Sequence, residues 1–332
     1  MLNVPISLLD LAAIGPGETI AESFQGSVEL ARLAERSGYA RVWYAEHHGI
    51  ASIASAATSV LIAHVAAHTE KIRLGAGGIM LPNHSPLTIA EQFGTLAELH
   101  PGRIDLGLGR APGGDLRTAR ALRRDANASD QFPADVLELR ELLGDGPARA
   151  VRAIPGHGTK VPLYILGSSL FGAQLAATLG LPYAFASHFA PALLHDAVRL
   201  YRERFTPSAA HSRPHVIAGV NVIAADSDDE AAAELEITRR VVVRNLIGRT
   251  DEAVHELPDE MLLRTPQAAF VEQMFTYRAV GSPSTVLSYL ERFQRQAAAD
   301  ELITVHHAPS VAARLRSVRL LAEAAGLAAT SG

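Results

Sequence analysis

The chain has 332 residues, of which 48% are hydrophobic and 20% charged, so it can bury a large core. A net charge of −5 gives no positive surface for nucleic acid, and the lack of cysteine excludes disulfides, thiolate metal sites and a cysteine nucleophile. The N-terminus has no basic segment followed by a long apolar core, and no run of about eighteen uncharged apolar residues occurs. We therefore expect a cytoplasmic protein without a signal peptide or membrane span.

Short β-rich runs alternate with helical segments along the whole chain. The runs predicted as strands are 4–11, 40–47, 71–81, 103–111, 161–169, 181–189, 215–226 and 301–307. Helices are predicted over 19–38, 54–68, 85–102, 133–143, 171–179, 191–205 and 309–325, and a helical insertion fills about 228–298. Because no break in composition suggests a linker, we expect a single domain over 1–332.

Apolar strands that alternate with helices indicate a parallel sheet covered on both faces. Eight such units predict a (β/α)8 TIM barrel with the insertion before the last strand. The alternative is an open doubly wound sheet, which would carry G-x-G-x-x-G after its first strand. The turn "AAIGPGE" does not match that pattern, so the barrel is favoured.

In such a barrel the site lies at the carboxyl ends of the strands. The residues that gather there are Asp10, Glu46, His47, His48, the turn 75–78, Arg110, Ser168, Ser169, His188, His306 and His307. We expect them to converge on one rim, although any one of them could simply be a polar strand end that meets water.

The pair His47 and His48 could be a metal site, a catalytic base or a polar strand end. Consecutive strand residues point to opposite faces, so both rings cannot easily bind one ion. An amidohydrolase-type H-x-H pair on the first strand is also absent. We predict no metal, with at most one of the two rings at the barrel mouth.

Two glycine-containing segments suggest a ligand. "GSSLFG" (167–172) opens a helix, where backbone amides and hydroxyls can bind an anion, and Arg110 could add a guanidinium; an ordinary serine cap is the alternative. "GAGGIMLP" places three glycines in a strand, which favours a bulge or a flat ligand against the backbone; tight barrel packing is the alternative.

Together these pieces resemble the bacterial luciferase-like flavin monooxygenase family, particularly its non-luminescent members. The resemblance covers nearly the whole chain. It is carried by "AEHH", by "LGAGGIMLPNHSPLTIAEQFGTLAELHPGRIDLGLGRAPGGD" (74–115) and by "LYILGSSLFGAQLAATLGLPYAFASHF" (163–189). Family members are barrels with an insertion before the last strand, and they bind reduced flavin, usually FMN, or in one branch a deazaflavin.

The resemblance implies a role for each matching residue. His47 takes the place of the catalytic histidine beside the flavin ring, with Glu46 orienting it, and Gly77–Gly78 matches a pair joined by a non-prolyl cis peptide beneath the flavin. Arg110 and Ser169 match phosphate-binding residues. Further positions expected to bind the cofactor are Gly109, Gly167, Ser168 and Gly172.

The sequence also departs from luciferase at several of these positions. Gly109 stands where luciferase has a reactive cysteine, Ser168 replaces a glutamate, and the backbone around Gly172 replaces a threonine. A second phosphate-binding arginine of luciferase falls near Gln131. The missing arginine weakens the expected hold on the phosphate, and Gly109 removes any role of the thiol.

The implied mechanism uses reduced FMN, supplied by a separate flavin reductase, and O2. A C4a-peroxyflavin then oxidises a small organic substrate, His47 acts as base or acid, and His188, His306 and His307 are candidates for substrate contact. The alternatives are a deazaflavin-dependent oxidoreductase and a non-catalytic flavin-binding barrel. A homodimer through the helices 51–68 and 85–99 is also implied.

Overall fold

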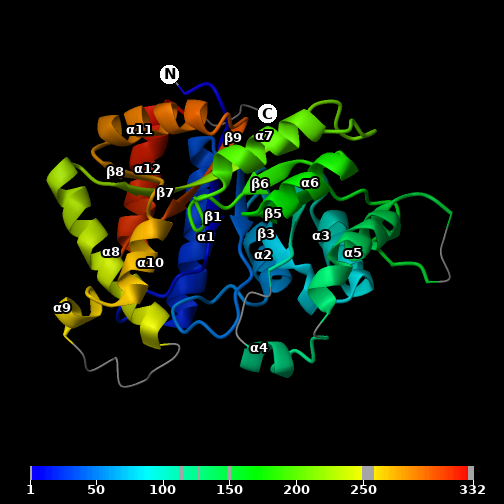
Figure 1. Ribbon diagram of the computed structural model, residues 1–332, viewed down its shortest axis with the longest axis horizontal. Helices are drawn as coiled ribbons and strands as arrows, with labels where there is room; N and C mark the ends of the chain where they lie inside the picture. Colours follow the sequence, from blue (N-terminus) through cyan, green and yellow to red (C-terminus); the bar gives the residue numbers. More distant parts are fainter. Residues whose placement is uncertain (1, 112–115, 126, 148–150, 249–257, 328–332) are drawn as a thin grey trace.

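The computed structural model describes residues 2–111, 116–125, 127–147, 151–248 and 258–327. It is a closed barrel of parallel strands with helices around it (Figure 1), because β6 and β7 pair and so join the two sides of the sheet. The predicted (β/α)8 barrel is confirmed, and the open doubly wound sheet is excluded. Residues 112–115, at the end of the motif 74–115, and residues 249–257 of the insertion lie outside the described residues.

The eight predicted strands are all present. The strands are β1 (Ile6–Asp10), β2 (Arg41–Tyr44), β3 (Arg73–Met80), β4 (Ile104–Gly109), β5 (Leu163–Gly167), β6 (Tyr183–Phe185), β7 (Val216–Ala224), β8 (Arg278–Gly281) and β9 (Glu301–His306). The helices are α1 (Ile20–Ser37), α2 (Thr58–Ala66), the short 3-10 turn η1 (Leu81–Asn83), α3 (Pro86–Leu99), α4 (Leu116–Ala121), α5 (Ala128–Leu143), α6 (Leu170–Leu179), α7 (Leu194–Arg204), α8 (Asp228–Gly248), α9 (Asp259–Leu262), α10 (Pro266–Met274), α11 (Pro283–Gln296) and α12 (Val311–Ala325).

Local sequence signals set the helix ends. Thr19 caps α1 by accepting a hydrogen bond from the backbone of Glu22, whose side chain bonds back to the cap. The helix stops at Gly38, which has a φ of 85° that favours glycine. This chemistry fixes where the chain turns back toward β2.

The insertion contains one strand that we did not expect. β8 pairs in parallel with the last four residues of β7, Asn221–Ala224, beyond the three residues at which β6 pairs with β7. It therefore extends the sheet without taking part in barrel closure. The expectation of a purely helical insertion was wrong at this element.

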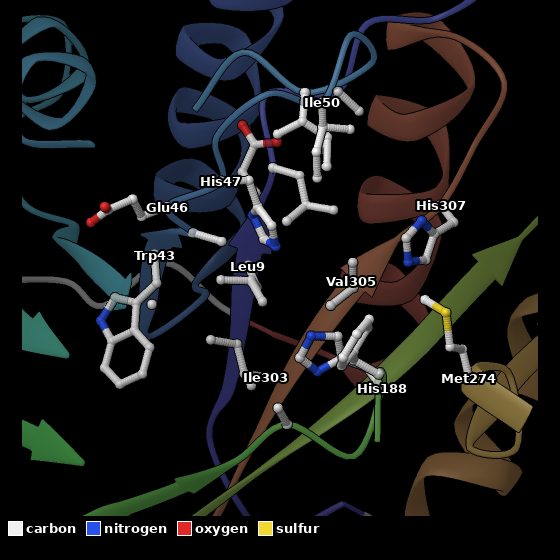
Figure 2. Close-up of a pocket in the computed structure, with 18 of the residues that line it drawn as sticks. Leu9, Trp43, Glu46, His47, Ile50, His188, Met274, Ile303, Val305 and His307 are labelled. Carbon is white, nitrogen blue, oxygen red and sulfur yellow. The ribbon is translucent and has the colours of Figure 1, made fainter. Parts of the chain in front are cut away.

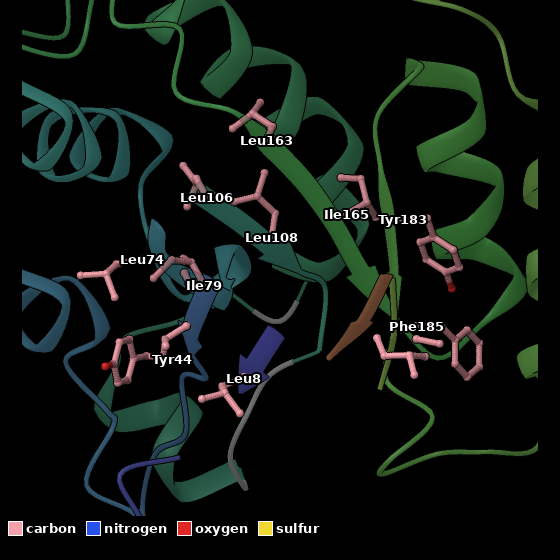
Figure 3. Packing of buried hydrophobic residues seen from close by; sticks show 14 of the residues in the cluster. Leu8, Tyr44, Leu74, Ile79, Leu106, Leu108, Leu163, Ile165, Tyr183 and Phe185 are labelled. Carbon is pink, nitrogen blue, oxygen red and sulfur yellow. The ribbon is translucent and has the colours of Figure 1, made fainter. Parts of the chain in front are cut away.

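Side chains alternate between the inside of the barrel and the layer under the helices. Along β2 and at the residue after it, Trp43 and Ala45 belong to the inner apolar cluster, whereas Val42 and Tyr44 pack outward. Figure 3 shows the outer layer, with residues such as Leu106, Leu108 and Ile165 packed beneath the helices. This parity decides which polar residues at the strand ends can reach the interior.

A charged cluster closes the amino end of the barrel. Arg41 donates hydrogen bonds to Asp105 at 2.7 Å, to Glu301 at 2.9 Å and to the Tyr164 hydroxyl at 2.8 Å. Asp105 also accepts from the Trp43 indole at 3.2 Å. The interior is therefore filled at this end, and open space remains at the carboxyl end.

The described helices include none that is both long and apolar enough to cross a membrane.

Candidate functional site

A cavity of about 880 Å³ lies at the carboxyl end of the barrel strands. Its walls are mainly apolar, and α8 and α10 of the insertion contribute part of them. Most residues predicted for the site line it, whereas His48, Gly75 and Ala76 do not; the lining residues include Asp10, Glu46, His47, Gly77, Gly78, Gly109, Arg110, Gly167, Ser168, Ser169, Gly172, His188, His306 and His307. The expected convergence of these residues on one rim is therefore what the structure shows.

His47 and Glu46 leave the end of β2 in opposite directions. Figure 2 shows the His47 ring turned into the cavity and the Glu46 carboxylate turned away from it. Glu46 accepts hydrogen bonds from His48 Nε2 at 2.7 Å, His84 Nε2 at 2.8 Å and the Met80 amide at 2.9 Å. In place of the expected contact with His47, Glu46 thus ties the segment after β2 to the end of β3 and to η1.

The charge of Glu46 is compensated where it is buried. Burial raises the pKa of this carboxyl, but the hydrogen bonds from His84, His48 and Met80 outweigh burial and hold the pKa below its usual range. The carboxylate is therefore charged at neutral pH. It anchors the backbone from which the His47 side chain projects.

His47 and His48 do not share a ligand. His48 bonds to Glu46 outside the barrel lumen, while His47 faces the cavity. Within the described residues, no three His, Asp or Glu side chains are grouped in a way that could hold a metal ion. This divergence is the one expected from the alternation of side chains along a strand.

His188 follows β6 and lies against β7 inside the barrel. A Cβ atom at Gly219 would be 2.2 Å from His188 Nδ1, so only glycine leaves room for this ring. The Asn221 amide donates a hydrogen bond to the His188 carbonyl at 2.9 Å. Burial, followed by the proximity of His307 and His47, lowers the pKa of His188 to about 3.

His306 and His307 divide between the two layers. His306 Nδ1 is 2.7 Å from the Ser317 hydroxyl on α12, and its Nε2 is 3.2 Å from the Thr304 hydroxyl. Both ring nitrogens of His306 are thus engaged under the helices, which argues against the expected substrate contact. His307 follows it into the cavity, where its ring packs on Phe275 with centroids 5.4 Å apart (Figure 2).

Glycines form one wall of the cavity where β3 is irregular. The register between β3 and β4 shifts between Ala76 and Ile79, and the Gly77–Gly78 peptide is cis. A Cβ at Gly78 would lie 2.6 Å from the Gly107 carbonyl oxygen, and one at Gly77 would lie 2.7 Å from the Leu9 side chain. Only glycine fits at these two positions, and the backbone there presents no side chain to the cavity.

A cationic end of the cavity lies beside α6. The exposed Arg110 stacks its guanidinium over the Phe171 ring at 4.3 Å, in the first turn of that helix. Ser169 caps the helix by accepting from the Gly172 amide at 3.4 Å, so the ordinary serine cap that was the alternative for this segment is present. A positive side chain and a helix N-terminus therefore face the same part of the cavity.

Sequence reasoning missed several residues that shape the site. His84 is the second histidine on Glu46, Gly219 accommodates His188, and Ser129 lines the cavity next to Arg110 while accepting a hydrogen bond from Arg124. The mid-strand glycine in "VIAGVNV" was the available signal for a close approach. The others depend on contacts between distant segments.

Comparison with known proteins places these features in a family. The model of the luciferase-like monooxygenase family matches residues 4–300. A luciferase-like monooxygenase of Escherichia coli K12 is 48% identical over 321 residues, which is 96% of each chain. The crystal structure of apo-MsnO8 superposes with a TM-score of 0.87 at 37% identity, covering 98% of this chain and 99% of that one.

Other relatives carry more specific names. An N-acetyl-S-alkylcysteine monooxygenase of Bacillus subtilis is 42% identical over 189 residues, 55% of this chain and 57% of its own. Among structures that share only the fold, one is a Baeyer-Villiger monooxygenase component in complex with FMN (TM-score 0.70, 18% identity, 97% of each chain). Another is an F420-dependent secondary alcohol dehydrogenase (TM-score 0.71, 17% identity, 97% of this chain and 99% of that one). With its barrel, its site and these matches together, the chain belongs to the luciferase-like monooxygenase family.

Proposed function

We propose that this protein is an FMN-dependent monooxygenase that uses reduced FMN and O2 to oxidise a small organic substrate. The observation that carries the proposal is the composition of the cavity. It combines a glycine surface at Gly77 and Gly78, a cationic end at Arg110, and the ring of His47, all within one mainly apolar space.

The described residues fit a flavin phosphate ester at two places. A planar ring can lie against the backbone of Gly77 and Gly78, because both residues line the cavity and present no side chain to it. A phosphate can meet Arg110 and the amino end of α6 at Ser168, Ser169 and Gly172. When bound, reduced flavin supplies the electrons that activate O2 for insertion of one oxygen atom into the substrate.

The protein residues act on protons, orientation and water. His47 follows β2 and its ring faces the cavity, so we assign it the proton transfers of the reaction. Glu46 acts through the backbone by anchoring the segment around His47. The apolar walls, among them Trp43, Ile303 and Val305, keep water from the reacting atoms.

We further propose that reduced FMN comes from a separate flavin reductase and that the chain forms a homodimer. Val60 on α2 and Leu99 on α3 are 68% and 64% exposed, and these two helices pack next to each other. Apolar side chains exposed on neighbouring helices suit a protein interface. Light scattering of the pure protein tests the dimer, and Val60→Glu is expected to shift it to monomer.

The test of the cofactor is a binding series with FMN, reduced FMN, riboflavin and a deazaflavin. Arg110→Ala is expected to weaken FMN about 10- to 100-fold and to leave riboflavin nearly unchanged, because riboflavin lacks the phosphate. Arg319→Ala removes the same charge from the exposed face of α12 and should leave both affinities unaltered. If the deazaflavin alone binds, the protein is instead a deazaflavin-dependent oxidoreductase.

The test of the reaction is O2 consumption with product analysis, starting from reduced FMN. An N-acetyl-S-alkylcysteine is the first substrate to try, given the relative that carries that name. His47→Ala should keep flavin affinity and lower kcat by about 10²- to 10⁴-fold. A protein that binds reduced FMN but oxygenates no compound of a substrate panel would be a non-catalytic flavin-binding barrel, and full turnover by His47→Ala would remove the role of His47.

A further inference from the structure

The His188 ring is held in one orientation by the backbone around it. Its Nδ1 edge lies over Gly219 of β7, where a Cβ would come within 2.2 Å. The adjacent backbone is fixed because Asn221 donates to the His188 carbonyl at 2.9 Å and the Ser187 hydroxyl donates to the Gly219 carbonyl at 2.5 Å. The ring therefore has little freedom to turn about its side-chain bonds.

The two ring nitrogens have different surroundings. Nδ1 is closed off and has no hydrogen-bond partner among the described residues. His188 as a whole is only partly buried and lines the cavity, and Figure 2 shows its ring turned into the space beneath His47. The side of the ring away from Gly219, which carries Nε2, is therefore the side that a ligand can reach.

This asymmetry selects one tautomer of the neutral ring. A proton on Nδ1 would be a buried N–H group without an acceptor, pressed against the Gly219 backbone, and such groups are rarer in proteins than unpaired acceptors. A proton on Nε2 faces the cavity and can find an acceptor there. The Nε2–H tautomer is thus the more stable one.

We propose that His188 orients the substrate by donating a hydrogen bond from Nε2 to a substrate oxygen, so that the substrate is an apolar molecule with a neutral acceptor such as a ketone or amide carbonyl. The identification of this partner as the substrate rests on the proposed monooxygenase function. The donor itself, and the ligand chemistry that it recognises, depend only on the geometry of His188, Gly219 and the cavity.

The charge state of the ring agrees with a neutral partner. The titratable groups that act on His188 are His307 at the end of β9 and His47 at the end of β2, and together with burial they lower the pKa of His188 to about 3. A ring that stays neutral offers one N–H and attracts no anion. The apolar side chains nearby, including Val305 and Met274, favour the hydrocarbon part of such a molecule (Figure 2).

The tautomer can be measured directly in the whole protein, with and without oxidised FMN. Nitrogen-15 spectra of the histidine side chains should show His188 with a protonated Nε2 and a bare Nδ1, unchanged between about pH 8 and about pH 5. Gly219→Ala should move these signals, because its Cβ displaces the ring. A protonated Nδ1, or titration of His188 in this interval, would overturn the proposal.

Ligand recognition is tested with cyclohexanone and methylenecyclohexane. The two molecules have nearly the same shape, but only the ketone accepts a hydrogen bond. His188→Leu should weaken the ketone relative to the alkene by about 2- to 10-fold, whereas His188→Gln, which keeps an N–H donor, should retain most of the preference. Equal effects of His188→Leu on both molecules would refute the hydrogen bond. Because neither measurement needs turnover, loss of the proposed function would be seen separately, in the flavin and O2 assays.

Discussion

Replacing His306 by asparagine should make the stability of the protein less dependent on pH. His306 is 7% exposed and lies between β9 and α12, with Nδ1 beside the Ser317 hydroxyl at 2.7 Å. Asparagine places an amide group near the position of Nδ1 and can keep that hydrogen bond, but it cannot bind a proton at these pH values. The substitution thus removes one titration and keeps one contact.

The expected size follows from the two pKa values. Burial, followed by His307 and Arg314, lowers the pKa of His306 to about 3 in the folded protein, whereas an unfolded histidine has a pKa of about 6.5. Between these values the unfolded chain binds a proton that the folded protein does not, so acidification destabilises the fold. His306 should cost the wild type about 2.5 kcal/mol between about pH 6 and about pH 4.

The assay is urea unfolding of wild type and His306→Asn at about pH 6, 5 and 4. Loss of the ring should contribute a pH-independent destabilisation of about 1–3 kcal/mol, through lost packing. The difference between the two proteins should then shrink by about 2.5 kcal/mol as the pH falls, because other titrating groups are common to both and cancel. Parallel curves would refute the claim that the folded protein holds His306 neutral.

Three further substitutions test the other parts of the barrel. Gly78→Ala should destabilise the fold by about 1–3 kcal/mol or more in urea unfolding, because its Cβ would meet the backbone of β4 at 2.6 Å. Gly109→Ala is the control and should leave the free energy of unfolding nearly unchanged, since the nearest contact of its Cβ is 3.7 Å away. Equal losses of stability in the two variants would contradict the claim that Gly78 is required by packing. Glu46→Gln should lower stability by about 1–3 kcal/mol and should also lower kcat, since the carboxylate that anchors the segment around His47 loses its charge. Unchanged turnover would remove the positioning role proposed for Glu46. Asp105→Asn breaks the buried pair with Arg41 and should cost about 3–5 kcal/mol in thermal or urea unfolding, with flavin affinity retained in the folded fraction.

The barrel was predictable because its signals are local. Each strand is a short apolar run, and each helix has its own periodicity and end signals. Eight repeats of the strand–helix unit are compatible with few architectures. β8 escaped prediction for a physical reason. Its four residues, Arg278–Gly281, pair only with the outer half of β7, and so short a segment carries no pattern that distinguishes it from the helical insertion around it.

The site was predictable in its location but less so in its orientations. The alternation rule separated His47 from His48 correctly, and the same rule separates His306 from His307 once it is known that Ile303 and Val305 face inward. The alternation of side chains along a strand is a local property. Whether the odd or the even residues of the strand face the lumen, however, depends on packing across the barrel. For this reason the sequence identified the strand end and missed which of its two histidines enters the cavity.

The two ends of the barrel differ in what a substitution there can change. At the amino end, Arg41, Asp105 and Glu301 satisfy one another in a closed, charged cluster, so a change there acts on stability and leaves the cavity walls in place. At the carboxyl end, polar groups such as His188 Nδ1 lack a partner and glycines replace side chains, so the fold gives up contacts to keep space for a ligand. Natural proteins accept such costs where function requires them. The concentration of these unfavourable features in one cavity is therefore itself physical support for binding and chemistry at that end.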